Sequence, residues 1–137
     1  MIHVYDSSFV SALVIPDDKI ISVEKNHIRI AKSGEIFTTP LFNYEIANIF
    51  RNLVRRKRYT SNEVVQFFPF ISAIGLKIDF EEGVNYQRRI WNLSNDYNLS
   101  TYDAAYLELA DRKKAVLCTL DNNLKNAAKT HGIKIID

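Results

Sequence analysis

The stretch STYDAAYLELADRKKAVLCTLDNNL, residues 100–124, decides the fold. Ser100 precedes an apolar helical pattern, as an N-cap does, and Asp103 stands three positions later in the first turn. Ala115–Thr119 is then a short apolar run of the kind that forms a buried strand. Asp121 follows this run and is a good N-cap for another helix. The stretch therefore predicts a helix, a buried strand and a second helix start, with a carboxylate at each helix start.

Short apolar runs alternate with helical patterns along the rest of the chain. Strands are expected at residues 2–5, 35–38, 76–78, 115–119 and 133–136, and helices at 7–15, 17–31, 41–59, 60–74, 80–97, 100–114 and 121–131. Thr60 and Glu63 have the spacing of a capping box. Strands that alternate with helices predict a parallel sheet with crossover helices on both faces. We expect a three-layer α/β/α sandwich with a central parallel sheet of four to five short strands.

The composition predicts one globular domain over residues 1–137. Apolar residues make up 47% of the chain and charged residues 25%, which disfavours disorder and a coiled coil. The net charge of +2 permits a nucleic-acid partner without arguing for one. The single cysteine, Cys118, cannot form an internal disulfide. Since no run resembles a signal peptide or approaches the ~20 apolar residues of a membrane span, we expect a cytoplasmic protein without a membrane partner.

Four carboxylates are predicted to meet at one edge of this sheet. Asp6 directly follows the first strand and Asp121 follows the strand that ends at Thr119, so both lie where parallel strands end. Glu45 and Asp103 lie in the first turns of helices that start from the same edge. Each acid alone is explained as a helix cap or a solvated side chain. Together they repel one another, and this raises their pKa values unless a cation holds them.

Oxygen is the only type of ligand atom near this predicted cluster, since no histidine or cysteine accompanies the four acids. Oxygen ligands favour a hard cation such as Mg²⁺ or Mn²⁺. Such an ion stabilises charge on phosphoryl oxygens and lowers the pKa of a bound water, so the pattern indicates phosphate chemistry. One ion and two ions are both compatible with the sequence. Asp96 and Asn122 are also within reach, and the number of ligands stays open.

Three other classes of phosphate-handling or nucleotide-binding protein fit less well. A phosphoacceptor receiver domain has an acidic pair after its first strand, whereas Asp6 is followed by Ser7 and Ser8. A dehalogenase-type phosphatase has a second Asp two positions after the first, and Ser8 stands there instead. The chain also has no glycine-rich phosphate loop, which excludes nucleotide-binding sites of the Rossmann or P-loop kind.

Several segments together resemble a PIN domain, most closely the small VapC-type toxin ribonucleases of toxin–antitoxin pairs. They are DSSFVSAL after the first strand, the Glu of PLFNYEIANIF, YDAAYLELA, and TLDNNL followed by GIKII. The resemblance covers essentially the whole chain, and it implies an endoribonuclease dependent on Mg²⁺ or Mn²⁺. Its acidic cluster would be Asp6, Glu45, Asp103 and Asp121. Glu45 would orient a metal-bound water or act as its base, and the three aspartates would be direct or water-bridged ligands.

The resemblance also implies groups around the acids. Ser7 and Thr119 are the expected supporting hydroxyls, and Asn122 is a further candidate for the surroundings of the ion. Tyr102 and Tyr106, which flank the YDAAY segment, are interpreted as core or dimer contacts rather than as platforms for RNA bases.

RNA and protein partners follow from the same reading. Candidate contacts to RNA phosphates are Arg51, Arg55 and Arg56, which a solvated helix end matched to the helix dipole explains equally well. The helices from Leu41 and Thr60 carry more apolar surface than one sheet face needs, so we expect a homodimer and a cognate antitoxin protein. The alternative function is a PIN-like scaffold that binds RNA or protein without cutting.

Overall fold

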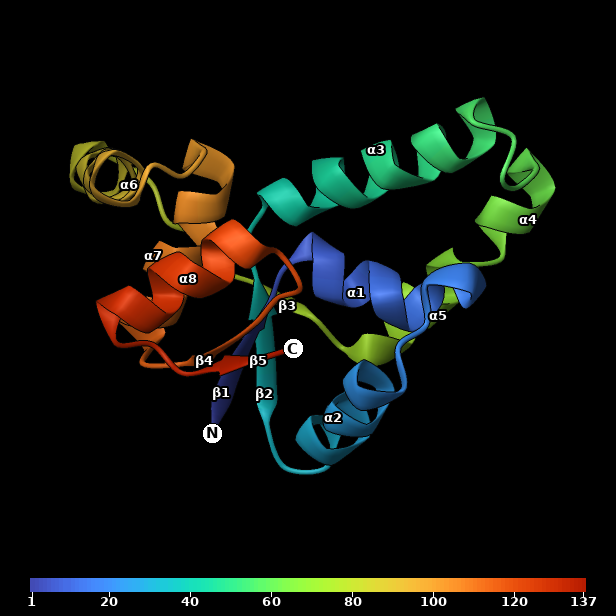
Figure 1. The fold of residues 1–137 in the computed structure, drawn as a ribbon, viewed down its shortest axis with the longest axis horizontal. Helices are drawn as coiled ribbons and strands as arrows, with labels where there is room; N and C mark the ends of the chain where they lie inside the picture. Colours follow the sequence, from blue (N-terminus) through green and yellow to red (C-terminus); the bar gives the residue numbers. More distant parts are fainter.

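The computed structural model describes residues 1–137 and contains one sheet of five parallel strands between two layers of helices (Figure 1). The strands are β1 (Ile2–Tyr5), β2 (Glu35–Thr38), β3 (Lys77–Ile78), β4 (Val116–Cys118) and β5 (Ile135–Ile136). Their order in the sheet is β3-β2-β1-β4-β5, so the first strand of the chain is the central one. The predicted three-layer parallel architecture is confirmed.

Helices cover both faces of the sheet, with α1 to α5 on one side and α6 to α8 on the other (Figure 1). The helices are α1 (Ser7–Val14), α2 (Ile21–Ala31), α3 (Leu41–Arg55), α4 (Ser61–Val65), α5 (Phe68–Ile74), α6 (Val84–Tyr97), α7 (Thr101–Lys113) and α8 (Asn122–His131), with a 3₁₀ turn, η1, at Pro16–Asp18. The capping box predicted at Thr60 and Glu63 is present.

Four predicted helices were wrong in their extent. The helix expected over 41–59 ends at Arg55, and Lys57 just beyond it takes a positive φ of 58°. The helix expected over 17–31 begins only at Ile21, because Pro16 opens a separate 3₁₀ turn. The helix expected over 60–74 is two helices, because Pro69 has no N–H to bond back to the preceding turn. The helix expected over 80–97 begins at Val84, after Gly83 takes a positive φ of 96°.

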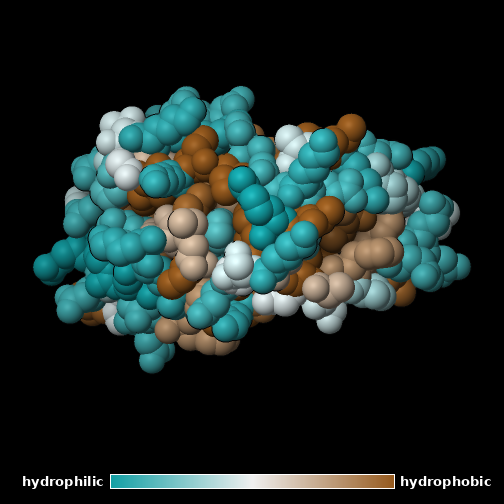
Figure 2. Space-filling view, turned by 90° about the horizontal axis from the view of Figure 1, so that it is seen from below, coloured by the Kyte–Doolittle hydropathy of each residue, from teal (hydrophilic) through white to brown (hydrophobic).

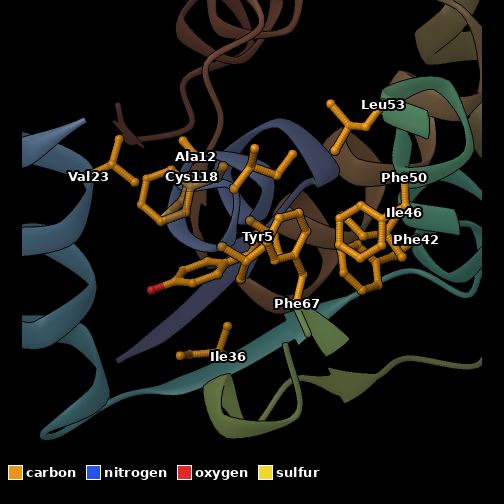
Figure 3. Close-up of a cluster of buried hydrophobic side chains, with 14 of the residues drawn as sticks. Tyr5, Ala12, Val23, Ile36, Phe42, Ile46, Phe50, Leu53, Phe67 and Cys118 are labelled. Atoms are coloured by element: carbon orange, nitrogen blue, oxygen red, sulfur yellow. The ribbon is translucent and has the colours of Figure 1, made fainter. Parts of the chain in front are cut away.

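Side chains alternate between the two faces of the sheet along each strand, so the protein has two hydrophobic cores, one on each face. Tyr5 of β1 and Cys118 of β4 point into the core under α1 to α5, whereas Val4 and Leu117 point into the core under α7 and α8. In the first core, the ring of Phe67 packs against Phe50 of the apolar stripe of α3, whereas the ring of Tyr5 packs against Phe9 of α1 (Figure 3). Apolar side chains project from both faces of β1 and β4 and are covered by helices on each side. Neither strand therefore has an exposed polar face.

The central pair of strands places the residues that follow them side by side. Tyr5 is paired with Cys118 in register, and the Asp6 N–H donates to the Cys118 carbonyl at 3.2 Å. The chain leaves β1 toward β2 on one side and reaches β4 on the other, so strand order reverses between β1 and β4. Crevices at the carboxyl ends of strands near such a reversal are where open parallel sheets bind their ligands.

The surface seen from below mixes polar and apolar side chains, with apolar patches between the charged groups (Figure 2). On α4 and α5, Val65, Phe68 and Phe70 are exposed, so part of the apolar surface expected there is present. None of the helices combines the length and the apolar character required to pass through a bilayer.

Candidate functional site

Asp6 is fixed at the end of β1 by hydrogen bonds to both of its carboxylate oxygens. Its Oδ1 accepts from the Ser8 hydroxyl at 2.7 Å and from the Phe9 N–H at 2.9 Å, which caps α1. Its Oδ2 accepts from the Thr119 hydroxyl. Burial raises the pKa of Asp6 to about 6, and repulsion from Asp103 adds to this, although the three hydrogen bonds favour the carboxylate.

Ser8 is a supporting residue that sequence reasoning missed. Its hydroxyl donates to Asp6 and accepts from the Leu120 N–H at 2.9 Å, so it joins the start of α1 to the segment after β4. Ser7, the serine singled out from the sequence, lies near Glu45 and lowers the pKa of that acid. The sequence position of Ser8 could have indicated this role. A serine two residues after an N-cap aspartate can turn back and donate to the capping carboxylate.

Glu45 lies in the second turn of α3 and receives a hydrogen bond from Tyr106. The Tyr106 hydroxyl donates to Oε1 of Glu45 at 2.6 Å, and the tyrosine is 1% exposed. Burial raises the pKa of Glu45, the bond from Tyr106 opposes that effect, and repulsion from Asp103 adds to it. Tyr106 is therefore a core residue, as predicted, whose hydroxyl also holds one of the four acids.

Asp103 and Asp121 occupy the helix starts predicted for them. The Asp103 N–H donates to the hydroxyl of the N-cap Ser100 at 3.1 Å, and Asp121 caps α8 by accepting from the Leu124 N–H at 2.8 Å. Burial raises the pKa of Asp103, and repulsion from Asp121 raises it further. Capping and convergence therefore coexist at this edge of the sheet.

Asp103 is the electrostatic centre of the group, because it acts on the pKa of both Asp6 and Glu45 and is itself acted on by Asp121. None of the four acids takes part in an ion pair with Lys, Arg or His. We call Asp6, Glu45, Asp103 and Asp121 the rim acids. Four carboxylates from four separate segments thus share one edge of the sheet without a cation from the protein.

The donor atoms and charge of the rim acids fit a hard divalent cation. The side chains are not arranged as a ready-made ion site, since no three Asp, Glu, His or Cys groups stand close enough to hold an ion together. Oxygens of Asp6, Glu45 and Asp121 face hydrogen-bond donors instead. A cation would compete with these donors for the carboxylate oxygens, and at Asp103 with the Ser100 side chain, whose hydrogen bond lowers the pKa of that acid.

A family model of the PIN domain matches residues 4–130. The chain belongs to the PIN-domain family. Ribonuclease VapC3 from Pyrobaculum aerophilum is 29% identical over 125 residues, which cover 88% of this chain and 90% of the relative. The resemblance to VapC-type PIN proteins is thereby confirmed.

Two solved structures share the fold of this PIN domain. VapBC2 from Rickettsia felis, solved with a DNA fragment from its promoter, has a TM-score of 0.69 and 14% identity and covers 99% of this chain and 98% of that one. VapC20 from Mycobacterium tuberculosis, described as a Sarcin-Ricin loop cleaving toxin, has a TM-score of 0.65 and 17% identity and covers 93% and 95%. These structures match the three-layer arrangement around the parallel sheet.

The remaining predicted residues of this PIN domain lie around the rim acids or away from them. Asn122 is exposed in the first turn of α8. Asp96 lines a different cavity, beside Asn123 and Asn126, and none of the shifted pKa values of the rim acids involves it. The candidate phosphate contacts are exposed and pair with no carboxylate; they are Arg51, Arg55 and Arg56.

Proposed function

We propose that this PIN domain is an endoribonuclease that hydrolyses RNA phosphodiester bonds with the help of Mg²⁺ or Mn²⁺. The observation that carries this proposal is the repulsion between Asp103 and each of the other three rim acids at one edge of the sheet, where no protein cation pairs with them. The relative VapC3 is named a ribonuclease, and VapC20 is described as cleaving the Sarcin-Ricin loop, which supports RNA as the substrate.

In this proposal Asp6, Asp103 and Asp121 would hold one or two ions, and Glu45 would accept the proton of the attacking water. The bound ion neutralises charge on phosphoryl oxygens and lowers the pKa of water. Glu45 presents Oε1 to Tyr106, which leaves Oε2 available to accept the proton of the attacking water. Its raised pKa makes it a stronger base than an ordinary glutamate. Water adds to phosphorus and its proton passes to Glu45, while one P–O ester bond breaks and the departing ribose oxygen takes up a proton from solvent.

We also infer that the protein is the toxin of a toxin–antitoxin pair in the cytoplasm and forms a homodimer. The VapBC2 neighbour supports an antitoxin partner. Exposed apolar side chains on α4 and α5, including Phe68 and Phe70, offer surface that a partner helix or a second subunit would bury. Light scattering of the protein alone and with the product of the neighbouring reading frame measures both assemblies.

The cleavage test compares wild type with Asp6→Asn and Asp103→Asn on RNA in Mg²⁺ or Mn²⁺. Each variant keeps the size of the side chain but removes one charge from the rim acids, so we expect a loss of about a hundredfold or more. Asp111→Asn is the matched control, because Asp111 lies on the same helix as Asp103 and pairs at the surface with Lys114 and His131, away from the rim acids. This control should cleave as wild type does.

Calorimetric titration with Mn²⁺ gives a readout that does not depend on cleavage. We expect measurable binding to wild type and to Asp111→Asn, and much weaker binding to Asp6→Asn and Asp103→Asn. Wild-type cleavage no greater than that of the two rim variants would refute the nuclease and leave the non-catalytic scaffold, for which RNA binding without cutting is the result to look for.

A further inference from the structure

Two of the seven tyrosines have neither a hydrogen-bond partner for the hydroxyl nor an aromatic or cationic partner for the ring. They are Tyr44 and Tyr102, which are 76% and 58% exposed. The other five each have such a partner: Tyr5 with His27, Tyr59 with Phe67, Tyr86 with Arg89, Tyr97 with His131 and Tyr106 with Glu45. Large rings left in water without a contact are candidates for binding a ligand.

Both unpartnered tyrosines line the same cavity. The cavity has a volume of about 480 Å³ and is lined by Leu41, Tyr44, Glu45, Asn48 and Tyr102. It lies between the start of α3 and the start of α7, two elements far apart in the chain. Its size falls in the ~300–1,000 Å³ range of small-molecule sites, and it combines aromatic rings with one amide and one carboxylate.

The cavity adjoins the rim acids directly. Tyr44 precedes Glu45 and Tyr102 precedes Asp103, and Glu45 itself forms part of the cavity lining. A phosphodiester held at the rim acids would therefore have its neighbouring nucleotide within reach of both rings.

A polar and basic stripe on α3 continues from this cavity. Tyr44, Asn48, Arg51 and Arg55 follow at spacings of four, three and four residues, which places them on one face of the helix. All four are exposed, and neither arginine pairs with a carboxylate. The phosphates of a bound RNA would follow this stripe along α3, away from the rim acids. Positive charge of this kind favours a polyanion over an apolar protein segment.

We propose that this cavity binds an unpaired base of the RNA beside the phosphate to be cleaved, with the base stacked on Tyr44 and Tyr102 and its edge hydrogen-bonded to Asn48. A base inside a duplex has both faces covered by its neighbours, so only an unpaired one offers a face to these rings. The inference rests on the proposed ribonuclease function and assigns Tyr44, Asn48 and Tyr102 as the residues that hold the base next to the cleaved phosphate. The exposure of Tyr102 shows that the predicted core contact was wrong, whereas the predicted dimer contact stays an outcome that the test below distinguishes.

Fluorescence anisotropy with a labelled single-stranded RNA tests the assignment in an Asp6→Asn background, which prevents cleavage. We expect Tyr44→Ala and Tyr102→Ala each to weaken binding about tenfold, and the double variant about a hundredfold. Tyr44→Phe and Tyr102→Phe keep the ring and should bind within about twofold of the parent. A duplex RNA of the same length should lose no affinity from any of these changes.

Phe80→Ala is the matched control, since Phe80 is a ring 80% exposed in the loop before α6, outside the cavity. It should bind the single strand as the parent does, and thermal unfolding should show all variants folded. Unchanged affinity in both alanine variants, or equal loss in the phenylalanine variants, would overturn the stacking assignment while wild-type cleavage still upheld the ribonuclease. If wild type neither bound nor cut RNA, both proposals would fail, and an altered oligomeric state of the alanine variants would assign the surface to a protein.

Discussion

Helix α7 carries two acids that the structure treats in opposite ways. Glu108 is 2% exposed and receives Arg89 at 3.0 Å and Arg112 at 2.8 Å, and Arg112 also binds Asp79. Asp103, one and a half turns earlier on the same helix, has no basic partner and stands among other carboxylates. The first cluster is neutralised by the protein itself and joins α6 and the end of β3 to α7. The second keeps its negative charge.

The protein stabilises the buried Glu108 with its own cations but leaves the rim acids without any. A buried carboxylate is costly unless charge or hydrogen bonds compensate it, and Glu108 is compensated by two guanidinium groups. The chain has eighteen Lys and Arg residues, yet none pairs with a rim acid. A basic side chain placed there would stabilise the fold and occupy the position that a divalent cation requires.

The largest expected effect is on the free energy of unfolding, to which Glu108 and Asp103 should contribute with opposite sign. Glu108→Gln leaves Arg89 and Arg112 without their shared carboxylate and should lower the free energy of unfolding by about 2–3 kcal/mol. Asp103→Asn removes repulsion and should leave that free energy unchanged or raise it. Urea unfolding in EDTA measures both. Equal losses in the two variants would remove the distinction between the clusters.

A second prediction concerns the pH dependence of stability without metal. Asp6 titrates near 3.8 when unfolded and near 6 when folded, so the folded protein binds this proton more tightly. The stability it contributes is fully present below about pH 4 and is lost as the pH rises through 6. Lowering the pH from 7 to 5 should therefore add about 1 kcal/mol from this group.

His3 and His27 act in the opposite direction, because their pKa values are lowered on folding and their contribution is lost as the pH falls through the range near 6.5. The comparison of wild type with Asp6→Asn cancels them. Urea unfolding at pH 7, 6 and 5 should show that the variant lacks the gain due to Asp6. Parallel curves for the two proteins would mean that Asp6 is not held in the predicted environment.

The smallest expected effect tests how Tyr106 positions Glu45 among the rim acids. Tyr106→Phe removes the hydroxyl that donates to Glu45 but keeps the buried ring, so Mn²⁺ affinity should fall about threefold to fivefold because Glu45 is less well oriented. Calorimetry measures this change. Tyr97→Phe is the matched control, since it removes a hydroxyl bonded to His131. A fall of the same size in the control would show a general loss of rigidity instead.

The parts of this molecule that sequence predicts are those with a local cause. Asp6, Ser100 and Asp121 are N-caps next to apolar runs, and a cap is recognised from its immediate neighbours. The parallel sheet then carries the caps to one edge, because every strand of such a sheet ends on the same side. Architecture and the approximate position of the rim acids therefore follow from patterns a few residues long.

The features that the sequence does not predict depend on contacts between residues far apart in the chain, or on which face of a helix is turned toward the site. The bond between Tyr106 and Glu45 joins residues 61 positions apart. Seven consecutive residues, 104–110, are buried, so α7 has no continuous polar face that would reveal which way Tyr102 points. Phe80 looked like the first apolar residue of a helix but is 80% exposed in the loop before α6.

The central position of β1 has a consequence for the order of events during synthesis. Ile2–Tyr5 is made first, yet one of its two neighbours, β4, begins only at Val116. Until then β1 has one open edge, and Asp6 lacks Thr119, its partner 113 residues away. Pairing between such distant segments is slow to form. A chain whose synthesis stalls before this point lacks Asp121, so the set of rim acids in the proposed nuclease would be incomplete.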